Sequence, residues 1–462
     1  MLPPHVSPTC VRIPSESPMP DFPSLLTDLI AAARKAGADG ADALGVESVS
    51  LSHAWRLGRT EKLERSEAAE LGLRVFVGRR QAIVSTTDLS KDTLAQVVER
   101  AVAMARVAPE DAYAGLAAPE QIGREPPRLD ILDEAEPAPE TLIARARAAE
   151  EAALAVAGVT NSEGAEASWG RTGVTLAASN GFLGSYARSG HSVSVSVLAG
   201  EGSGMERDYD YSSTVFAADL EAPETVGRRA GERAVARLNP RKARTCKVPV
   251  VYDPRVARGL LGHLVGAVSG PAIARGTSFL KDRLGKPVFA PGVRIIDDPH
   301  RPRGLRSRPF DGEGLASRPT DIVADGVLQT WLLDLASARQ LGLAPTGHAG
   351  RGTSGPPSPA TSNFYLAPGH VTAKELIADI PEGFYVTELM GFGINPVTGD
   401  YSRGAAGFWI IGGEIAHPVS EVTVAANLKD MFAGLTPAND LEFRAGMDSP
   451  TLRIDTMTVA GA

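Results

Sequence analysis

The segment from Asp253 to Val288 constrains the fold of this chain more than any other. Asp253 is a favourable N-cap and Pro254 suits the first helical position, so a helix is predicted to begin here. An apolar strand over Val248 to Tyr252 precedes it directly. Apolar residues then recur at helical spacing and predict one wide buried face, formed by Leu260, Leu261, Leu264, Val265 and Val268.

Three glycines interrupt this helix at Gly259, Gly262 and Gly266. Each of them lowers the helix propensity of its position relative to Ala. We therefore expect another backbone element or a ligand to approach the helix closely, with a second element of the chain crossing it here.

The segment resembles the central helix of the PmbA/TldD family, whose zinc-peptidase branch (TldD) carries His-Glu-x-x-x-His after an apolar pair. With Leu260 and Leu261 placed on that pair, the motif positions are held by Gly262, His263 and Ala267. A hydrolytic zinc site needs nitrogen, sulfur or oxygen ligands and a carboxylate that takes a proton from the bound water. Gly and Ala supply no ligand. The chain therefore resembles the branch without the metal motif, called PmbA or TldE, and no metal ligand or catalytic residue is predicted in it.

Two more segments carry the resemblance, which spans nearly the whole chain from about Asp21. They are ARGTSFLKDRLGKPVF from Ala274 to Phe289 and GFGINPVTGDYSRGAAGFW from Gly391 to Trp409. The resemblance implies a cytoplasmic heterodimer in which a TldD-type homologue holds the zinc and cleaves unfolded peptides. It also leaves room for a homodimer when that partner is missing. Candidate contacts with substrate or partner are Arg275, Ser278, Asn395, Asp400, Tyr401 and Arg403.

Two interpretations of the Gly391 to Trp409 loop remain open. In the first, the loop lines a chamber between subunits and helps to hold an extended peptide. In the second, it is a buried structural loop whose polar groups satisfy one another. A different class of function also stays open, since the family has been described as a modulator of DNA gyrase. In that case the chain is a pure interaction protein.

Composition excludes several classes of protein. A hydrophobic content of 43% with 22% charged residues is that of an ordinary globular protein. The net charge of -8 argues against a general affinity for nucleic acid, which clustered Lys and Arg would drive. The longest uncharged apolar stretch, Gly259 to Ala274, is too short and too rich in glycine for a membrane span. Two cysteines and a start without a secretory signal favour the cytoplasm.

The predicted fold class is α+β. Residues 1–20 are rich in Pro and Ser and are predicted to be a disordered tail. Residues 21–125 and 126–238 form an N-terminal α/β half in two pieces, each a hairpin sheet with helices. Residues 239–462 form a mainly antiparallel β domain around the central helix. Asn180-Gly181 predicts a tight hairpin, and the alternation from Ser192 to Leu198 predicts a strand with one polar face.

Three short patterns receive a structural interpretation instead of a catalytic one. Ser278 and Lys281 match the Ser-x-x-Lys pattern of penicillin-recognising enzymes. The Ser-Asp-Asn and Lys-Thr-Gly motifs of that family are missing from the sequence. A hydrolase that uses Ser278 and Lys281 stays open as a third hypothesis. Gly350 to Gly355 has the spacing G-x-G-x-x-G, yet Pro356 and Pro357 follow where a helix is required, so a mobile loop is predicted. The remaining histidines are scattered singly.

Overall fold

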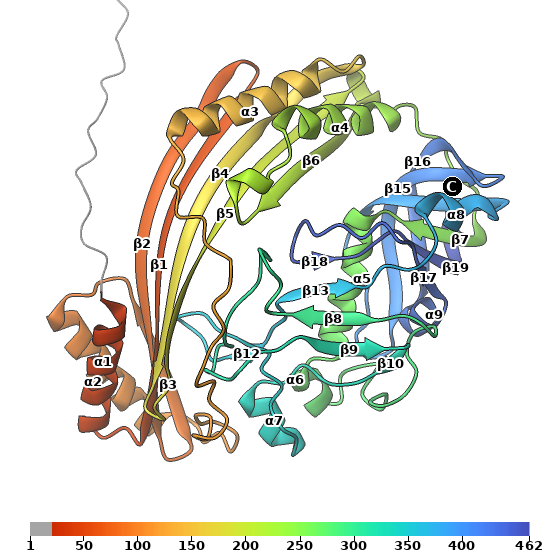
Figure 1. Ribbon diagram of the computed structural model, residues 1–462. Helices are drawn as coiled ribbons and strands as arrows, with labels where there is room; N and C mark the ends of the chain where they lie inside the picture. Colours follow the sequence, from red (N-terminus) through yellow and green to blue (C-terminus); the bar gives the residue numbers. More distant parts are fainter. Residues whose placement is uncertain (1–20, 462) are drawn as a thin grey trace, which may run out of the picture.

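The computed structural model of the chain describes residues 21–461 and shows two β-rich halves (Figure 1). A long curved sheet forms the N-terminal half, and the C-terminal half sits within its curve. The predicted α+β class is confirmed. The tail predicted over residues 1–20 lies outside the described residues. No helix between residues 21 and 461 is long and apolar enough to cross a membrane.

The N-terminal half is built on one antiparallel sheet with the strand order β3-β2-β1-β4-β5-β6, so the two predicted pieces share a single sheet. Asn180-Gly181 makes the predicted hairpin, with Ala177 opposite Leu183. The strands are β1 (Gly40–Arg56), β2 (Arg59–Val77), β3 (Arg80–Thr86), β4 (Val159–Ala178), β5 (Leu183–Ala199) and β6 (Glu206–Thr214).

Four helices cover one face of this sheet in two pairs. The apolar stripes of α1 and α2 pack on β1, β2, β3 and one end of β4, and those of α3 and α4 pack on β4, β5, β6 and the other end of β1, which gives two separate cores. Alternating side chains of the strands point into these cores. The helices are α1 (Phe22–Lys35), α2 (Lys91–Val107), α3 (Pro139–Leu154) and α4 (Pro223–Ala236).

The opposite face of the sheet looks toward the C-terminal half and is rich in serine. On β5, Val193, Val195 and Val197 are buried against the helices, while the serines between them are half-buried on the other face. This confirms the single polar face predicted for that strand. The aromatic contact of Tyr186 with Phe310, whose ring centroids are 5.4 Å apart, shows that this face meets the C-terminal half.

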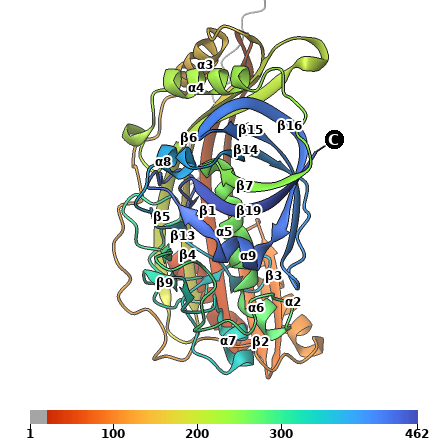
Figure 2. The same cartoon turned by 90° about the vertical axis from the view of Figure 1, so that its right-hand side faces the viewer.

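The C-terminal half contains a small barrel (Figure 2). Its strands follow the order β16-β15-β14-β7-β19-β17, and an additional pairing of β16 with β19 closes the ring. All pairs except β7 with β14 are antiparallel, which agrees with the predicted mainly antiparallel domain. The strands are β7 (Cys246–Tyr252), β14 (Glu382–Met390), β15 (Asp400–Ile411), β16 (Glu414–Asn427), β17 (Leu435–Pro437) and β19 (Leu452–Ala460).

A second, smaller sheet has the order β10-β9-β8-β13-β18, and the pair β11 (Ala349–Gly350) and β12 (Ser358–Pro359) stands apart from it. Helix α5 (Pro254–Ala267) lies between the barrel and this sheet, contacting β14, β13 and β18. The sheet strands are β8 (Ile295–Asp298), β9 (Thr320–Ala324), β10 (Val327–Leu328), β13 (Asn363–Leu366) and β18 (Met447–Asp448). The other helices are α6 (Gly270–Ala274), α7 (Leu335–Leu341), α8 (Ala373–Ala378) and α9 (Leu428–Ala433).

The start of α5 agrees with the prediction, but its surroundings do not. The Asp253 carboxylate accepts a hydrogen bond from the Arg255 backbone N–H at 2.9 Å and caps the helix. The expected close approach of a second element to these glycines is not seen among residues 21–461: a Cβ added to Gly259 or Gly266 would meet no atom of another element within 4 Å, and at Gly262 it would meet only the sulfur of Met447 on β18, at 4.0 Å. The glycine side of α5 is therefore open in the single chain.

The loop from Gly350 to Gly355 was predicted to be mobile, and the structure shows that it is packed. It projects from the C-terminal half onto the N-terminal sheet, where its Arg351 guanidinium pairs with the buried Asp42 carboxylate at 2.6 Å. The Thr353 carbonyl oxygen lies 2.0 Å from where a Cβ would stand on Gly72 of β2. This loop is therefore a point of docking between the two halves.

Candidate functional site

The fold brings α5, the segment that follows it and the Gly391 to Trp409 loop together. The His263 ring on α5 meets the Tyr401 ring on β15 edge to face, with centroids 5.9 Å apart. The Phe279 backbone N–H donates to the Pro396 carbonyl at 2.9 Å and so ties the segment after the helix to the Gly391 to Trp409 loop. Residues more than a hundred positions apart in the sequence thus form a single surface.

The residues at the motif positions do not fit a zinc ion. Gly262 has no side chain, and Ala267 is buried in the core, where its carbonyl accepts a hydrogen bond from the Ser278 hydroxyl at 2.6 Å. His263 alone offers a nitrogen, and no group of three His, Cys, Asp or Glu among residues 21–461 is arranged to hold a metal. Zinc needs three or four such donors.

The electrostatics around His263 also disfavour a cation. Burial, together with the positive charge of Arg403, lowers the pKa of His263 to about 4. The imidazole is therefore neutral at pH 7, and a guanidinium rather than a carboxylate is its charged neighbour. This position therefore holds no carboxylate that could act as the general base in peptide hydrolysis.

This low pKa predicts a specific pH dependence of stability. The unfolded chain takes up a proton at His263 near pH 6.5, whereas the folded chain does so only near pH 4, so the stabilisation is complete above pH 6.5 and is lost as the pH falls toward 4. Because His263 is partly exposed, we expect this effect to lower the free energy of unfolding by about 1–2 kcal/mol. We expect His263→Gln to flatten the fall in unfolding free energy between pH 7.5 and pH 5, measured by urea denaturation. The exposed His370→Gln is the control, and equal slopes in both variants would contradict the prediction.

Two of the predicted contact residues hold the loop together. The Asn395 side-chain oxygen accepts a hydrogen bond from the Val397 backbone N–H at 2.9 Å. The Asp400 carboxylate accepts from the Thr398 hydroxyl at 2.6 Å and from the Asn427 amide at 3.1 Å, and these bonds lower the pKa of Asp400. These residues match the structural interpretation of the loop, since their polar groups satisfy one another.

The other side chains of the loop differ sharply in exposure. Tyr401 is buried, and its hydroxyl meets no hydrogen-bond partner among the described residues. Arg403 is half-buried, donates from Nε to the Met390 carbonyl at 3.2 Å, and lies 5.8 Å from the ring centre of Phe392. Phe392 is 99% exposed. An aromatic ring presented fully to solvent on an ordered loop is typical of a surface that contacts another molecule.

The remaining candidates separate into one buried and one exposed residue. Ser278 is buried, and its hydroxyl also accepts from the Leu280 backbone N–H at 3.0 Å, so it shapes the turn after the helix. Lys281 is exposed, and its contact with Ser278 is a backbone one, from its N–H to the Ser278 carbonyl at 3.3 Å, while the Ser278 hydroxyl bonds to Ala267 and Leu280. This arrangement gives no support to the hydrolase hypothesis. Arg275 is exposed at the end of α6 and is free to contact a partner or substrate.

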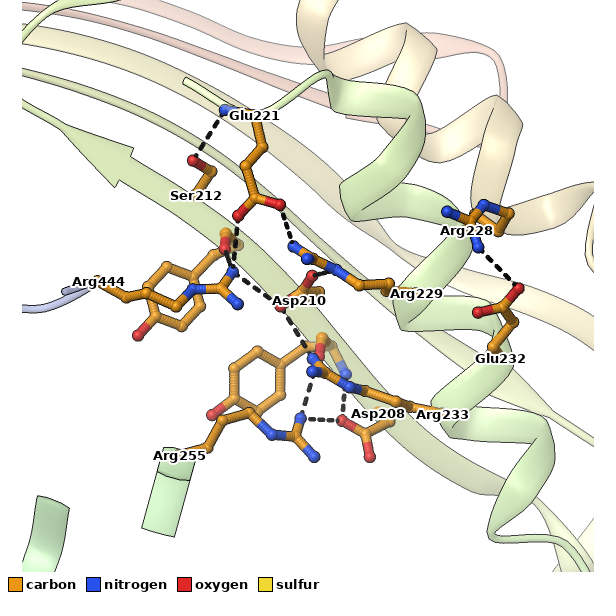
Figure 3. Close-up of polar contacts among 12 residues, drawn as sticks. Asp208, Asp210, Ser212, Glu221, Arg228, Arg229, Glu232, Arg233, Arg255 and Arg444 are labelled. Atoms are coloured by element: carbon orange, nitrogen blue, oxygen red, sulfur yellow. Dashed lines mark hydrogen bonds and ion pairs between the residues drawn. The ribbon is translucent and has the colours of Figure 1, made fainter. Parts of the chain in front are cut away.

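A network of arginines and aspartates that the sequence analysis did not single out anchors α5 to the N-terminal sheet (Figure 3). Asp210 on β6 accepts from Arg229 at 2.6 Å and Arg233 at 2.9 Å, both on α4, and from Arg444 of the C-terminal half at 3.2 Å. Nearby, Asp208 accepts from Arg255 in the first turn of α5 at 2.6 Å. Two features of the sequence could have indicated this network. One is the alternation of Asp and Tyr in Asp208-Tyr-Asp-Tyr-Ser212, and the other is the helical spacing of Arg229 and Arg233.

Sequence models of three domains match the chain in order. They describe PmbA/TldA metallopeptidase domain 1 over residues 41–105, the central domain over 132–238 and the C-terminal domain over 245–461. Metalloprotease PmbA of Escherichia coli O157:H7 is 40% identical over 425 residues, which is 92% of each chain. The Haemophilus influenzae PmbA homolog is 38% identical over 93% of this chain and 94% of its own.

Solved structures share the whole fold. A protein of Bacteroides thetaiotaomicron described as a candidate modulator of DNA gyrase superposes with a TM-score of 0.88 at 27% identity, covering 95% of this chain and 98% of its own. TldE from Thermococcus kodakarensis superposes with a TM-score of 0.86 at 19% identity, covering 95% and 100%. At that identity, the second comparison speaks for the fold alone.

Proposed function

Because the chain belongs to the PmbA/TldD metallopeptidase family but carries Gly262, His263 and Ala267 where a zinc site needs ligands, we propose that it is a metal-free subunit of a two-chain peptidase. In this proposal a zinc-bearing homologue, held in a cytoplasmic heterodimer, supplies the metal and its hydrolytic chemistry. The present chain shapes the chamber and holds unfolded or extended peptides. Residue chemistry at the three motif positions is the observation that carries the proposal.

The surface around α5 supports a role in contact rather than in catalysis. Its glycine side is open, and the loop that meets α5 through Tyr401 and His263 carries the exposed Phe392 and is braced by its own hydrogen bonds. An extended peptide has free backbone donors and acceptors, which a strand-rich lining can pair with whatever the peptide sequence. A folded protein offers no such strand, so selectivity for unfolded chains follows.

The first test compares the chain alone with the chain mixed with its zinc-bearing homologue. We expect the purified chain to hold less than stoichiometric zinc by elemental analysis and to leave unfolded casein intact. The mixture should cleave casein faster than the homologue alone. Stoichiometric zinc together with casein cleavage by the isolated chain would refute the proposal.

A pair of variants sharpens this test. Phe392→Ser changes a fully exposed ring, so it should leave the folded chain intact while reducing the stimulation of the homologue. Leu183→Ser is the matched control, because Leu183 is 53% exposed on the distant β4–β5 turn and should leave the stimulation unchanged.

One observation favours a second candidate function. The Bacteroides thetaiotaomicron protein that shares this fold at 27% identity is described as a candidate modulator of DNA gyrase. A non-enzymatic interaction protein would copurify with gyrase and not with a zinc-bearing homologue. That result would favour this alternative over the peptidase subunit.

A further inference from the structure

A large cleft lies between the serine-rich face of the N-terminal sheet and the C-terminal half, away from α5. Its volume is about 800 Å³. Among the described residues, four arginines line it and no Asp or Glu does, in a chain whose acidic residues outnumber its basic ones. A cleft lined by charge of one sign concentrates ligands of the opposite sign. The lining therefore points to an anionic ligand.

The four arginines differ in how much of their hydrogen-bonding capacity is free. Arg308 donates to the Ala349 and Ala360 carbonyls at 3.0 and 3.1 Å and is already committed to the fold. Arg188 and Arg306 are exposed, and neither has a carboxylate within 4.0 Å between residues 21 and 461. These two guanidinium groups can each offer paired N–H donors to a carboxylate.

Arg351 adds a buried positive charge that its own neighbours do not balance. Its side chain is only 1% exposed, and its Nε and Nη2 find no hydrogen-bond partner among the described residues. Within the part of the chain that the structure describes, its ion-pair partner is Asp42, which is shared with Arg74. Burial raises the pKa of the adjacent Glu313 to about 8, so that carboxyl is largely protonated at pH 7. Asp42 is thus the carboxylate that both guanidinium groups contact within 4.0 Å among residues 21–461, while Asp334 acts on Arg74 from farther away.

The floor of the cleft is shaped for an extended chain. Gly170 on β4 is paired with Gly190 on β5, and Ser50 on β1 completes the row. A Cβ added to Gly190 would meet no atom within 4 Å. Glycine in a central strand weakens the sheet, and it often marks a place where a ligand or another backbone approaches closely. Hydroxyl groups on either side, such as those of Ser52 and Thr172, provide further donors.

We infer that this cleft binds an acidic stretch of an extended peptide, which lies over the Gly170–Gly190 floor with its carboxylates toward Arg188 and Arg306. The inference rests on the proposed function, because it names a class of peptide that the subunit would hold. A nucleotide fits less well. The two aromatic side chains in the lining, Trp169 and Tyr186, are respectively buried and packed against Phe310, so neither offers a free ring face for a base.

The test uses the isolated full-length chain, without zinc or partner. Its probe is a fluorescein-labelled peptide of alternating Asp and Ser, compared with the same peptide carrying Asn for Asp, since alternate side chains of an extended peptide point the same way. By fluorescence anisotropy, we expect the acidic peptide to bind about tenfold or more tightly than its amide counterpart, with affinity falling as salt is added.

Three variants and one control locate the binding. Arg188→Gln and Arg306→Gln should each weaken binding of the acidic peptide by about three- to tenfold. Gly190→Thr places a β-branched side chain in open space on a strand, so it should fold normally and reduce binding at least as much. The control is Arg79→Gln, which changes an exposed arginine in the β2–β3 turn and should have no effect.

Equal affinity for the two peptides would overturn the inference. So would unchanged affinity in folded Arg306→Gln and Gly190→Thr, or displacement of the peptide by a single-stranded oligonucleotide. Because neither zinc nor partner is present, these outcomes are independent of the casein assay. Loss of the cleft inference would leave the proposed subunit function standing, and zinc-dependent cleavage by the isolated chain would refute that function without affecting the peptide-binding result.

Discussion

Replacing Asp210 with Asn is expected to lower the free energy of unfolding by about 3–5 kcal/mol, the cost of removing one partner from a buried ionic network. Asp210 is fully buried and accepts from three arginines that belong to both halves of the molecule. The Asn side chain keeps one acceptor oxygen but turns a donor N–H₂ toward a guanidinium. The buried positive charges then lack a counter-charge, and the anchor between β6, α4 and the C-terminal half weakens.

Equilibrium unfolding in urea, followed by circular dichroism, measures this loss. Glu232→Gln on α4, the helix that carries two of the arginines bound to Asp210, is the matched control, because the Arg228–Glu232 pair is exposed and contributes less than about 0.5 kcal/mol (Figure 3). If Asp210→Asn proved as mild as Glu232→Gln, the network would not anchor the two halves. A change in the slope of unfolding free energy against urea would instead show that the halves unfold separately.

The second large effect is expected from Gly72→Ala. The added methyl would lie 2.0 Å from the Thr353 carbonyl oxygen, so either β2 or the docked Gly350 to Gly355 loop must move. Overpacking against backbone costs about 1–3 kcal/mol or more, since a carbonyl cannot rotate away as a side-chain end can. Moving this loop also pulls Arg351 from Asp42 and exposes a buried ion pair.

Two measurements separate this effect from a general loss of β structure. Gly170→Ala is the control, because its added methyl would find its nearest neighbour at an ordinary 3.6 Å within the same sheet. Hydrogen exchange should show faster exchange across residues 349–359 in Gly72→Ala and unchanged exchange there in Gly170→Ala. Unaltered protection in Gly72→Ala would mean that the loop is not held by its contact with β2.

Local chemistry made several elements predictable. Asp253 and Pro254 fix the start of α5 through the cap itself, and Asn180-Gly181 fixes a hairpin through the left-handed backbone that glycine adopts there, with φ of +98° at Gly181. By contrast, nothing in the sequence marks the start of β2 at Arg59. Residues 59–68 are exposed on both faces, so no alternation of apolar residues marks them as a strand.

The candidate site was predictable in its parts and not in its assembly. The motif positions on α5 and the Gly391 to Trp409 loop could be identified from residue types, but the burial of Ala267 and Ser278 and the exposure of Phe392 depend on what packs around them. The packed Gly350 to Gly355 loop shows the same limit. Its glycines and prolines indicate flexibility locally, whereas Arg351 is held by an aspartate more than three hundred residues away.

The sequence by itself determined the family, the α+β class, and the chemical inability of Gly262 and Ala267 to ligate a metal, since each of these depends on residue type and short-range spacing. Only the tertiary structure decided that β16 closes a barrel on β19, that Asp210 joins the two halves, and that an arginine-lined cleft faces a floor of glycine. The physical reason is that pairing, burial and electrostatic balance depend on neighbours brought together by folding, which local propensity does not encode.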